Sequence, residues 1–300
     1  MKKLLAIILT ALLAISFVAC GEEDGNNNNE DLNNAVKEEL TLKGNENGSY
    51  TLTYGVNENG TYEILGLNYD GVSEVKIKIP QAEIDKLDRP ITGIADEAFK
   101  ACKNLASIEI PDTVTYIGKA AFYDCDKLTS VVLPLSLTTV EPMAFQGCDA
   151  LVAVTAKEGD VVVNDETVKS GLTSIGFAAF KDCKVLTTVT LPKTTLETID
   201  EAAFMNCTAL TKFTIPTSVK TLGAGVFKGC TALKTVTALG NPTSIGDPTN
   251  ADRDYVFDSS LENVLTIKVT SNTSMEKYAN DNNFKVSVVN AQDPTTPDWD

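Results

Sequence analysis

Cysteine and histidine set the first limits on the chemistry of this 300-residue sequence, which contains seven Cys and no His. Without His the chain has no Ser-His-Asp or Cys-His hydrolase site, no His-ligated zinc and no imidazole base. A carboxylate-pair glycosidase needs two acids ~5–10 Å apart in one cleft, and the sequence shows no isolated pair of this kind. We therefore predict that the protein is not an enzyme and takes no cofactor.

One acidic segment has the ligand spacing of a calcium loop. Asn250, Asp252 and Asp254 place oxygen ligands at alternate positions, as the start of an EF-hand loop does. Tyr255 stands where that loop needs Gly, and Leu261 stands where it needs Glu. The three residues are therefore a weak calcium candidate, and a solvated acidic loop is the favoured interpretation. No other metal site is predicted.

The net charge of −16 comes from 41 acidic and 25 basic side chains. Nucleic-acid binding needs a cationic surface that displaces the counterions of the phosphates. A polybasic module that docks on a membrane surface needs the same kind of charge. The composition therefore predicts no nucleic-acid partner and no electrostatic membrane docking.

The N-terminus has the features of an export signal. Lys2 and Lys3 precede an apolar run over residues 4–19, an arrangement typical of a secretory signal peptide. The run is short for a hydrocarbon core of ~30 Å. The sequence Phe-Val-Ala-Cys at 17–20 resembles a bacterial lipobox. That resemblance implies that residues 1–19 are removed and that Cys20 is lipidated.

The segment that follows Cys20 is acidic and rich in Asn. Its first residues, Gly-Glu-Glu-Asp at 21–24, resemble the surface-export signal of lipoproteins from Bacteroidetes-type bacteria. The resemblance implies an outer-membrane protein that is exposed at the cell surface and contacts the membrane through its lipid anchor only. A polar, charged segment cannot support a core, so residues 20–37 are expected to form a disordered tether.

The other six cysteines mark a sequence repeat, because they are separated by 23, 23, 35, 24 and 23 residues. A fixed period in the twenties is the signature of a solenoid. A Phe lies three residues before each Cys and a Leu three residues after it. The cysteines are Cys102, Cys125, Cys148, Cys183, Cys207 and Cys230; the phenylalanines are Phe99, Phe122, Phe145, Phe180, Phe204 and Phe227.

Each repeat contains two hydrophobic periods. Ala98, Phe99, Cys102 and Leu105 fall on one face of a short helix, and the equivalent residues do so in the other repeats. After the Leu the period becomes two, as in a short strand that ends at Pro, and a second aliphatic pair then leads to the next helix. No unit can bury its Phe and Leu alone, so stacking must build the core. The predicted fold is an α/β solenoid of ~23-residue repeats, each a short strand plus a short helix.

The consensus L-x-x-[VIF]-x-[IL]-P-x-[ST], followed by A-F-x-x-C, resembles the BspA-like leucine-rich repeats of bacterial surface proteins over about residues 62–262. Thr113, Ser136, Thr195 and Ser218 stand where most leucine-rich repeats carry Asn, and their hydroxyls are expected to bond the backbone in the same way. The resemblance implies an adhesin or interaction protein, since relatives engage host extracellular-matrix proteins or other bacteria.

The ends of the repeat array are expected to differ from its middle, because their outer faces meet water. Asn59-Gly60 between two alternating segments predicts a hairpin. We expect residues 38–90 to form an N-terminal β cap with an incomplete first rung, 91–262 the leucine-rich repeats, 263–288 a C-terminal cap and 289–300 a flexible tail. Insertions after Ala156 and Ala238 interrupt the period and are expected to be loops.

The repeat cysteines allow two interpretations. An exported protein with an even number of cysteines permits disulfides. Their identical position in every repeat instead favours six inward-facing, buried free thiols with a packing role. Disulfides remain the alternative, although their geometry is restrictive.

The strands present a row of outward positions that is mostly Ser and Thr. This polar row is the candidate concave binding face, and Thr could equally stand there because it suits strands. We predict a protein ligand for it, and the alternative is a glycan-binding accessory role, which the scarcity of exposed aromatics disfavours. The candidate face consists of Ser107, Glu109, Ser130, Val132, Thr155, Thr188, Thr190, Lys212, Thr214, Thr235 and Thr237.

Overall fold

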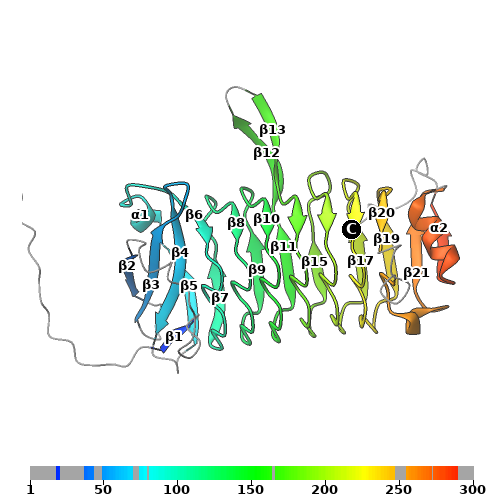
Figure 1. Ribbon diagram of the computed structural model, residues 1–300, viewed down its shortest axis with the longest axis horizontal. Helices are drawn as coiled ribbons and strands as arrows, with labels where there is room; N and C mark the ends of the chain where they lie inside the picture. The colour runs from blue at the N-terminus through cyan, green and yellow to red at the C-terminus, as the bar shows by residue number, and fades with distance from the viewer. Residues whose placement is uncertain are drawn as a thin grey trace, which may run out of the picture.

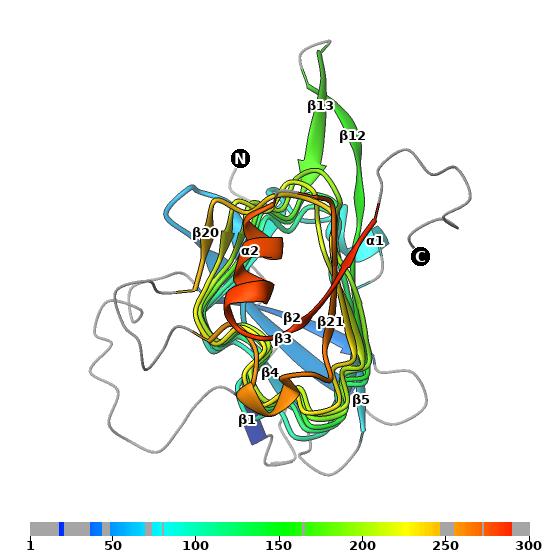
Figure 2. The ribbon, with the colours of Figure 1, turned by 90° about the vertical axis from the view of Figure 1, so that its right-hand side faces the viewer.

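The computed structural model describes residues 18–20, 37–43, 49–69, 74–79, 81–163, 166–246, 255–271 and 273–289. The rungs stack side by side along the long axis of the molecule in a nearly straight row (Figure 1). Viewed along that axis, two sheets lie on opposite sides of a common core (Figure 2). This is the predicted repeat solenoid. In the described ranges no helix is both long and apolar enough to cross a membrane.

The first sheet begins with antiparallel strands and continues with short parallel strands, one from each rung. Its strands are β1 (Val18–Cys20), β2 (Lys37–Lys43), β3 (Ser49–Val56), β4 (Tyr62–Tyr69), β6 (Ile91–Ile94), β8 (Tyr116–Ile117), β10 (Thr139–Val140), β14 (Ser174–Ile175), β16 (Thr198–Ile199), β18 (Thr221–Leu222) and β20 (Ser244–Ile245). Strands β2, β3 and β4 are antiparallel, β1 pairs with β4, and pairing is parallel from β4 onward.

The opposite side consists of parallel strands in three hydrogen-bonded groups. These are β5 and β7, then β9, β11 and β15, then β17, β19, β21 and β22. We call their outward surface the strand face. Their bounds are β5 (Val75–Lys78), β7 (Leu105–Glu109), β9 (Ser130–Leu133), β11 (Ala153–Ala156), β15 (Thr188–Thr190), β17 (Lys212–Ile215), β19 (Thr235–Ala238), β21 (Thr266–Val269) and β22 (Lys285–Val288).

The predicted short helix of each repeat is wrong, because these segments are turns. Glu97 and Ala101 have left-handed φ angles of 59° and 55°, and residues in this conformation interrupt an α-helical hydrogen-bond ladder. The Cys102 amide bonds back to the Phe99 carbonyl (3.1 Å), while the Phe99 amide donates to the Ala121 carbonyl of the next rung (2.7 Å). Backbone amides such as that of Phe99 therefore form hydrogen bonds between rungs, and they are not available for the hydrogen bonds within a helix.

Helices in the described part of the chain lie near the two ends of the array. They are α1 (Gln81–Ile84), the 3-10 turn η2 (Ser259–Leu261) and α2 (Ser274–Asp281). Helix α2 packs against β20, β21 and β22 at the C-terminal end (Figure 2). Thr273 is the N-cap of α2: its hydroxyl oxygen accepts a hydrogen bond from the Glu276 amide at 3.1 Å.

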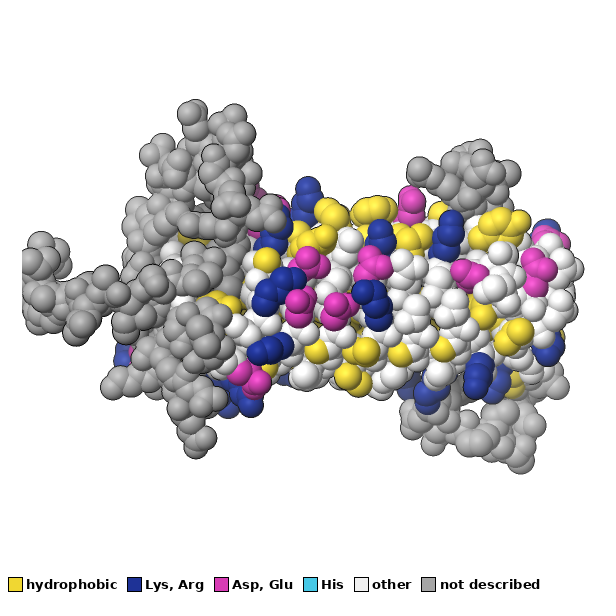
Figure 3. All heavy atoms as spheres, turned by 90° about the horizontal axis from the view of Figure 1, so that it is seen from below, with side chains coloured by type: hydrophobic (Ala, Val, Ile, Leu, Met, Phe, Trp, Pro, Cys, Tyr) yellow, Lys and Arg dark blue, Asp and Glu magenta, His cyan; other side chains and the backbone are white. Residues whose placement is uncertain are grey.

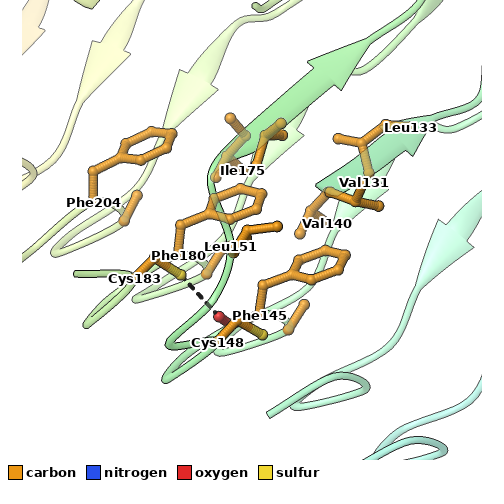
Figure 4. Close-up of a cluster of buried hydrophobic side chains, with 14 of the residues drawn as sticks. Val131, Leu133, Val140, Phe145, Cys148, Leu151, Ile175, Phe180, Cys183 and Phe204 are labelled. Atoms are coloured by element: carbon orange, nitrogen blue, oxygen red, sulfur yellow. Dashed lines mark hydrogen bonds between the residues drawn. The ribbon is translucent and has the colours of Figure 1, made fainter. Parts of the chain in front are cut away.

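The repeated phenylalanines form one continuous column through the core. The ring of Phe180 lies between Phe145 and Phe204, with centroids 5.2 and 5.3 Å away and nearly parallel planes. All three rings are fully buried, and Figure 4 shows them in line among the aliphatic side chains of the two sheets. The column continues to Phe257, 5.4 Å from Phe227, in a segment without a Cys.

The cysteines form a second column beside the phenylalanines. The Cys183 Sγ donates to the Phe145 carbonyl of the preceding rung at 3.2 Å (Figure 4), and Cys148 does the same to Phe122. Burial raises the pKa of Cys183 to about 12 and also raises the pKa of Cys148. Five of the repeat cysteines, from Cys125 onward, are free and buried, as predicted.

The expectation of a free thiol is wrong for Cys102. This residue is buried but disulfide-bonded. It begins the cysteine column.

Thiol alkylation distinguishes these two states of cysteine. In the folded protein no repeat cysteine is expected to react, because the thiols are buried. The raised pKa of Cys125, Cys148, Cys183 and Cys207 also leaves little thiolate at these four positions. After denaturation of the unlipidated protein without reductant, mass spectrometry should find label on Cys125, Cys148, Cys183, Cys207 and Cys230, and on Cys102 only after reduction. Unlabelled Cys148 in the denatured, unreduced protein would contradict the assignment.

The insertion after Ala156 is a hairpin rather than the expected loop. Strands β12 (Glu158–Val163) and β13 (Glu166–Gly171) pair antiparallel and project from one edge of the stack (Figures 1 and 2). At its base the Glu158 carboxylate accepts bonds from the amides of Lys193 (2.8 Å) and Thr194 (2.7 Å) in the next rung. The hairpin is thus fixed to the solenoid through Glu158.

Candidate binding faces

The predicted binding residues lie on the strand face and point away from the core. None of them is buried, and the register aligns them from rung to rung. Thr155 lies between Val132 and Thr190 on neighbouring strands, and Lys212 pairs with Thr235. The structure separates the set into groups, since Ser107 and Glu109 pair with β5 rather than with β9.

Hydrogen-bonding capacity on the strand face is largely unused. Within the described residues, the hydroxyls of Thr155, Thr190 and Thr237 have no hydrogen-bond partner, and each hydroxyl offers one donor and two acceptor positions. Val132 adds an apolar side chain that is 50% exposed. Charges lie toward the two ends: Lys78 pairs with Glu109 at 2.9 Å near the N-terminal end, and Lys212 and Lys268 are exposed near the C-terminal end. The central part is uncharged, polar and regular.

A hydroxyl ladder supports the turns that follow the strands. Each of these side chains donates to a backbone carbonyl one rung earlier, as predicted. The pairs are Thr113 to Ile91 (2.6 Å), Ser136 to Val114 (2.6 Å), Thr195 to Leu172 (3.0 Å) and Ser218 to Leu196 (2.6 Å). These hydroxyls are committed to the scaffold and are not available to a ligand.

The outer face of the first sheet is a second polar surface, which the sequence reasoning missed. One row donates its hydroxyls to carbonyls one rung earlier, as Thr138 does to Thr115 at 2.9 Å and Thr173 does to Thr138 at 2.9 Å. The adjacent row consists of Thr139, Ser174, Thr198 and Thr221, which are aligned by the strand register. In the described structure the hydroxyls of this second row have no protein partner.

Tyr116 begins that second row and lies across Gly93. A Cβ on Gly93 would lie 2.2 Å from the Tyr116 ring carbon Cζ. Beyond Gly93, the Tyr116 hydroxyl donates to Glu63 Oε2 at 2.5 Å and accepts from Asn57 Nδ2 at 3.5 Å. Burial, and then the bond to Glu63, raise the pKa of Tyr116 well above its usual value. The ring is therefore neutral and fixed.

Seen from below, charged side chains of both signs are interspersed along the middle of the molecule (Figure 3). Lys103 contacts Asp126 at 2.9 Å and Asp124 at 3.7 Å, and Lys184 contacts Asp149 at 3.3 Å. No group of three or more Cys, Asp or Glu within the described ranges could hold a metal ion. The calcium candidates Asn250, Asp252 and Asp254 lie outside those ranges, as does most of the insertion after Ala238.

Comparison with protein families gives one match. The BspA type leucine rich repeat region matches with six copies, over residues 81–168 and 160–287. No curated protein matches the chain.

Several solved structures are similar. The leucine rich repeat protein TpLRR of T. pallidum is 29% identical, covers 65% of this chain and 83% of its own, and has a TM-score of 0.53. A leucine-rich repeat protein from Bacteroides ovatus is 26% identical over 73% of this chain and 53% of its own, with a TM-score of 0.49. A leucine rich cell surface protein from Faecalibacterium prausnitzii is 26% identical over 67% of this chain and 55% of its own, with a TM-score of 0.41.

Proposed function

The chain belongs to the BspA-type leucine-rich repeat family, and from that premise we propose that it is a non-catalytic surface protein whose strand face binds another protein. Repeat solenoids present extended, regular surfaces that suit protein recognition. The family and its fold are typical of scaffolds rather than of enzymes. The ligand class we propose is a protein of the host extracellular matrix or of another bacterial surface.

The observation that carries this proposal is the uncommitted polar array in the centre of the strand face. Thr188 and Thr190 lie on β15, and Thr155 lies opposite Thr190 on the adjacent strand β11, ~4.8 Å away. The hydroxyls of these three residues have no partner within the described protein. Beside them, the exposed Val132 supplies the apolar contact that protein interfaces combine with polar groups. Aromatic rings do not occur among the outward positions of the described strands on this face, which disfavours carbohydrate as its ligand.

The proposed location is the outer membrane, with the solenoid held at the cell surface. Support comes from the N-terminal signal: the charged Lys2 and Lys3, the apolar run and the lipobox-like residues 17–20. Lipidation of the Cys20 thiol would provide the membrane contact, and residues up to 37 would act as the tether. Because Cys20 is the one cysteine left to pair with Cys102, this modification would leave Cys102 as a free thiol in the mature protein. Cleavage before Cys20 would remove Val18 and Ala19 from β1, so in this proposal β1 is a feature of the precursor.

Arginine substitutions on the strand face test the binding proposal. The double variant Thr155→Arg/Thr190→Arg places two bulky charges in the centre of the uncharged array and removes no core contact. We expect full-length protein with this change to lose at least about tenfold in affinity for immobilised matrix proteins or intact bacteria, which is about 1.4 kcal/mol. Its melting temperature should match that of the wild type.

The matched control is Thr231→Arg, which adds the same side chain at an exposed turn position away from both sheets. This variant is expected to bind like the wild type. Equal binding by the double variant and the control would place the contact elsewhere. Absence of binding by the wild type to every matrix protein and bacterium tested would contradict the proposed function itself.

A further inference from the structure

We propose that the first sheet carries a second binding site, for a neutral polysaccharide, formed by the ring of Tyr116 and the row of free hydroxyls that follows it. This site lies on the side of the solenoid opposite the strand face (Figure 2). It goes beyond the proposed protein-binding function and does not depend on it.

The ring of Tyr116 is positioned as a flat platform. Glu63, Gly93 and Tyr116 occupy one line across three neighbouring strands. The Tyr116 side chain passes over Gly93 to reach Glu63, so it lies along the sheet instead of standing away from it. One ring face is turned to the backbone of Gly93, and the side chain remains partly exposed. The negative face of an aromatic ring attracts C–H groups, which the apolar face of a pyranose supplies.

The hydroxyl row extends the platform in one direction. Thr139 is the register partner of Tyr116, and Ser174, Thr198 and Thr221 continue the row. Successive hydroxyls are therefore spaced by one strand, ~4.8 Å. They lack partners within the described chain and are partly exposed. A periodic row of groups that both donate and accept matches a polymer with periodic hydroxyls.

Comparison with the adjacent row shows that this hydrogen-bonding capacity is not used by the fold. Thr115, Thr138 and Thr173 donate their hydroxyls to carbonyls one rung earlier. One sheet thus carries two parallel rows of hydroxyls: those of the first row donate hydrogen bonds to the backbone, and those of the second row have no partner within the described chain. Thr115, Thr138 and Thr173 stabilise the backbone through these hydrogen bonds, whereas the hydroxyls of the second row make no equivalent contribution to the fold.

The negative charge of the protein and of the residues near Tyr116 favours a neutral ligand over an anionic one. Glu63 lies at the platform and Asp96 lies in the neighbouring rung, where it accepts a bond from the Lys119 amide. At the far end, Glu197 and Lys220 neutralise each other at 2.6 Å. With a net charge of −16, the protein repels polyanions. Uronate or sulfated polymers are therefore disfavoured, and so are nucleic acids, whose bases also stack on aromatic rings.

Affinity electrophoresis of the full-length protein through gels that contain polysaccharide tests the site. The probes are a panel of soluble neutral glucans, mannans and galactans, with polygalacturonate for comparison. We expect at least one neutral polymer to retard the wild type and polygalacturonate not to. Tyr116→Ala should weaken the retardation at least about tenfold, whereas Tyr116→Phe, which keeps the ring, should retain most of it.

Two further variants separate binding from folding. Tyr123→Ala removes a partly exposed tyrosine from a turn and should be retarded like the wild type. Thr198→Glu adds a charge to the free row without a change in the core, and should lose retardation at an unchanged melting temperature. The proposal is overturned if no neutral polymer retards the wild type, or if Tyr116→Ala and Thr198→Glu are both retarded normally. The strand-face variant Thr155→Arg/Thr190→Arg should keep its retardation, so the two proposals fail independently.

Discussion

Replacement of Phe180 by Ala is expected to lower the free energy of unfolding by about 3–5 kcal/mol. The ring is fully buried and stacked between Phe145 and Phe204. In a solenoid each rung contacts only its neighbours, so few side chains are available to fill the cavity. Chemical denaturation followed by circular dichroism measures the change.

Phe177→Ala provides the matched control, because this Phe lies three residues earlier in the same turn and is 41% exposed. Its removal should change the unfolding free energy by no more than about 0.5 kcal/mol. Similar losses for the two variants would show that the phenylalanine column does not hold the rungs together.

Gly223→Ala is expected to cost about 3 kcal/mol, the second large effect. A Cβ at this position would lie 2.3 Å from the Glu201 amide nitrogen and 2.5 Å from the Asp200 carbonyl carbon. Both atoms belong to the backbone of the preceding rung, which cannot rotate away as a flexible side chain would. The substitution therefore forces two rungs apart, and the midpoint of chemical denaturation should fall accordingly.

Gly225→Ala separates this steric effect from the conformational cost of losing glycine. Gly225 has a left-handed φ of 62°, but nothing lies closer than 3.6 Å to its hypothetical Cβ. Its replacement should cost only about 1 kcal/mol, the penalty for an L-residue in this conformation. If Gly225→Ala proved the more damaging of the two, the close approach of the rungs at Gly223 would be contradicted.

The repeat architecture could be predicted because it depends on residues that recur at one interval. Phe145 and Cys148 have the same neighbours in every rung, so their period reveals the stack directly. The hydroxyls of Thr113 and Ser136 were likewise predictable, since each bonds a carbonyl within one repeat length. The outward orientation of Thr155 and Thr190 followed from alternation along a strand.

What could not be predicted depends on contacts between rungs. Apolar residues at i and i+4 fit a helix and also fit the observed turn, and only the amide bonds to the next rung decide between them. The left-handed Ala101 gives no local signal, because Ala does not favour that conformation. The contact between Tyr116 and Gly93 could be predicted only if the register of β6 and β8 were known. The valine-rich sequence of the hairpin β12–β13 was a signal for strands, but this insertion occurs in one repeat only, so no recurrence supported the assignment.

In the proposed function the solenoid presents its binding face outside the cell. The most direct measurement treats intact cells with a membrane-impermeant, amine-reactive reagent and follows the exposed Lys127, Lys193 and Lys212 by mass spectrometry. We expect the same modification on intact cells as after lysis, while a periplasmic control protein stays unmodified. Modification of these lysines only after lysis would contradict it.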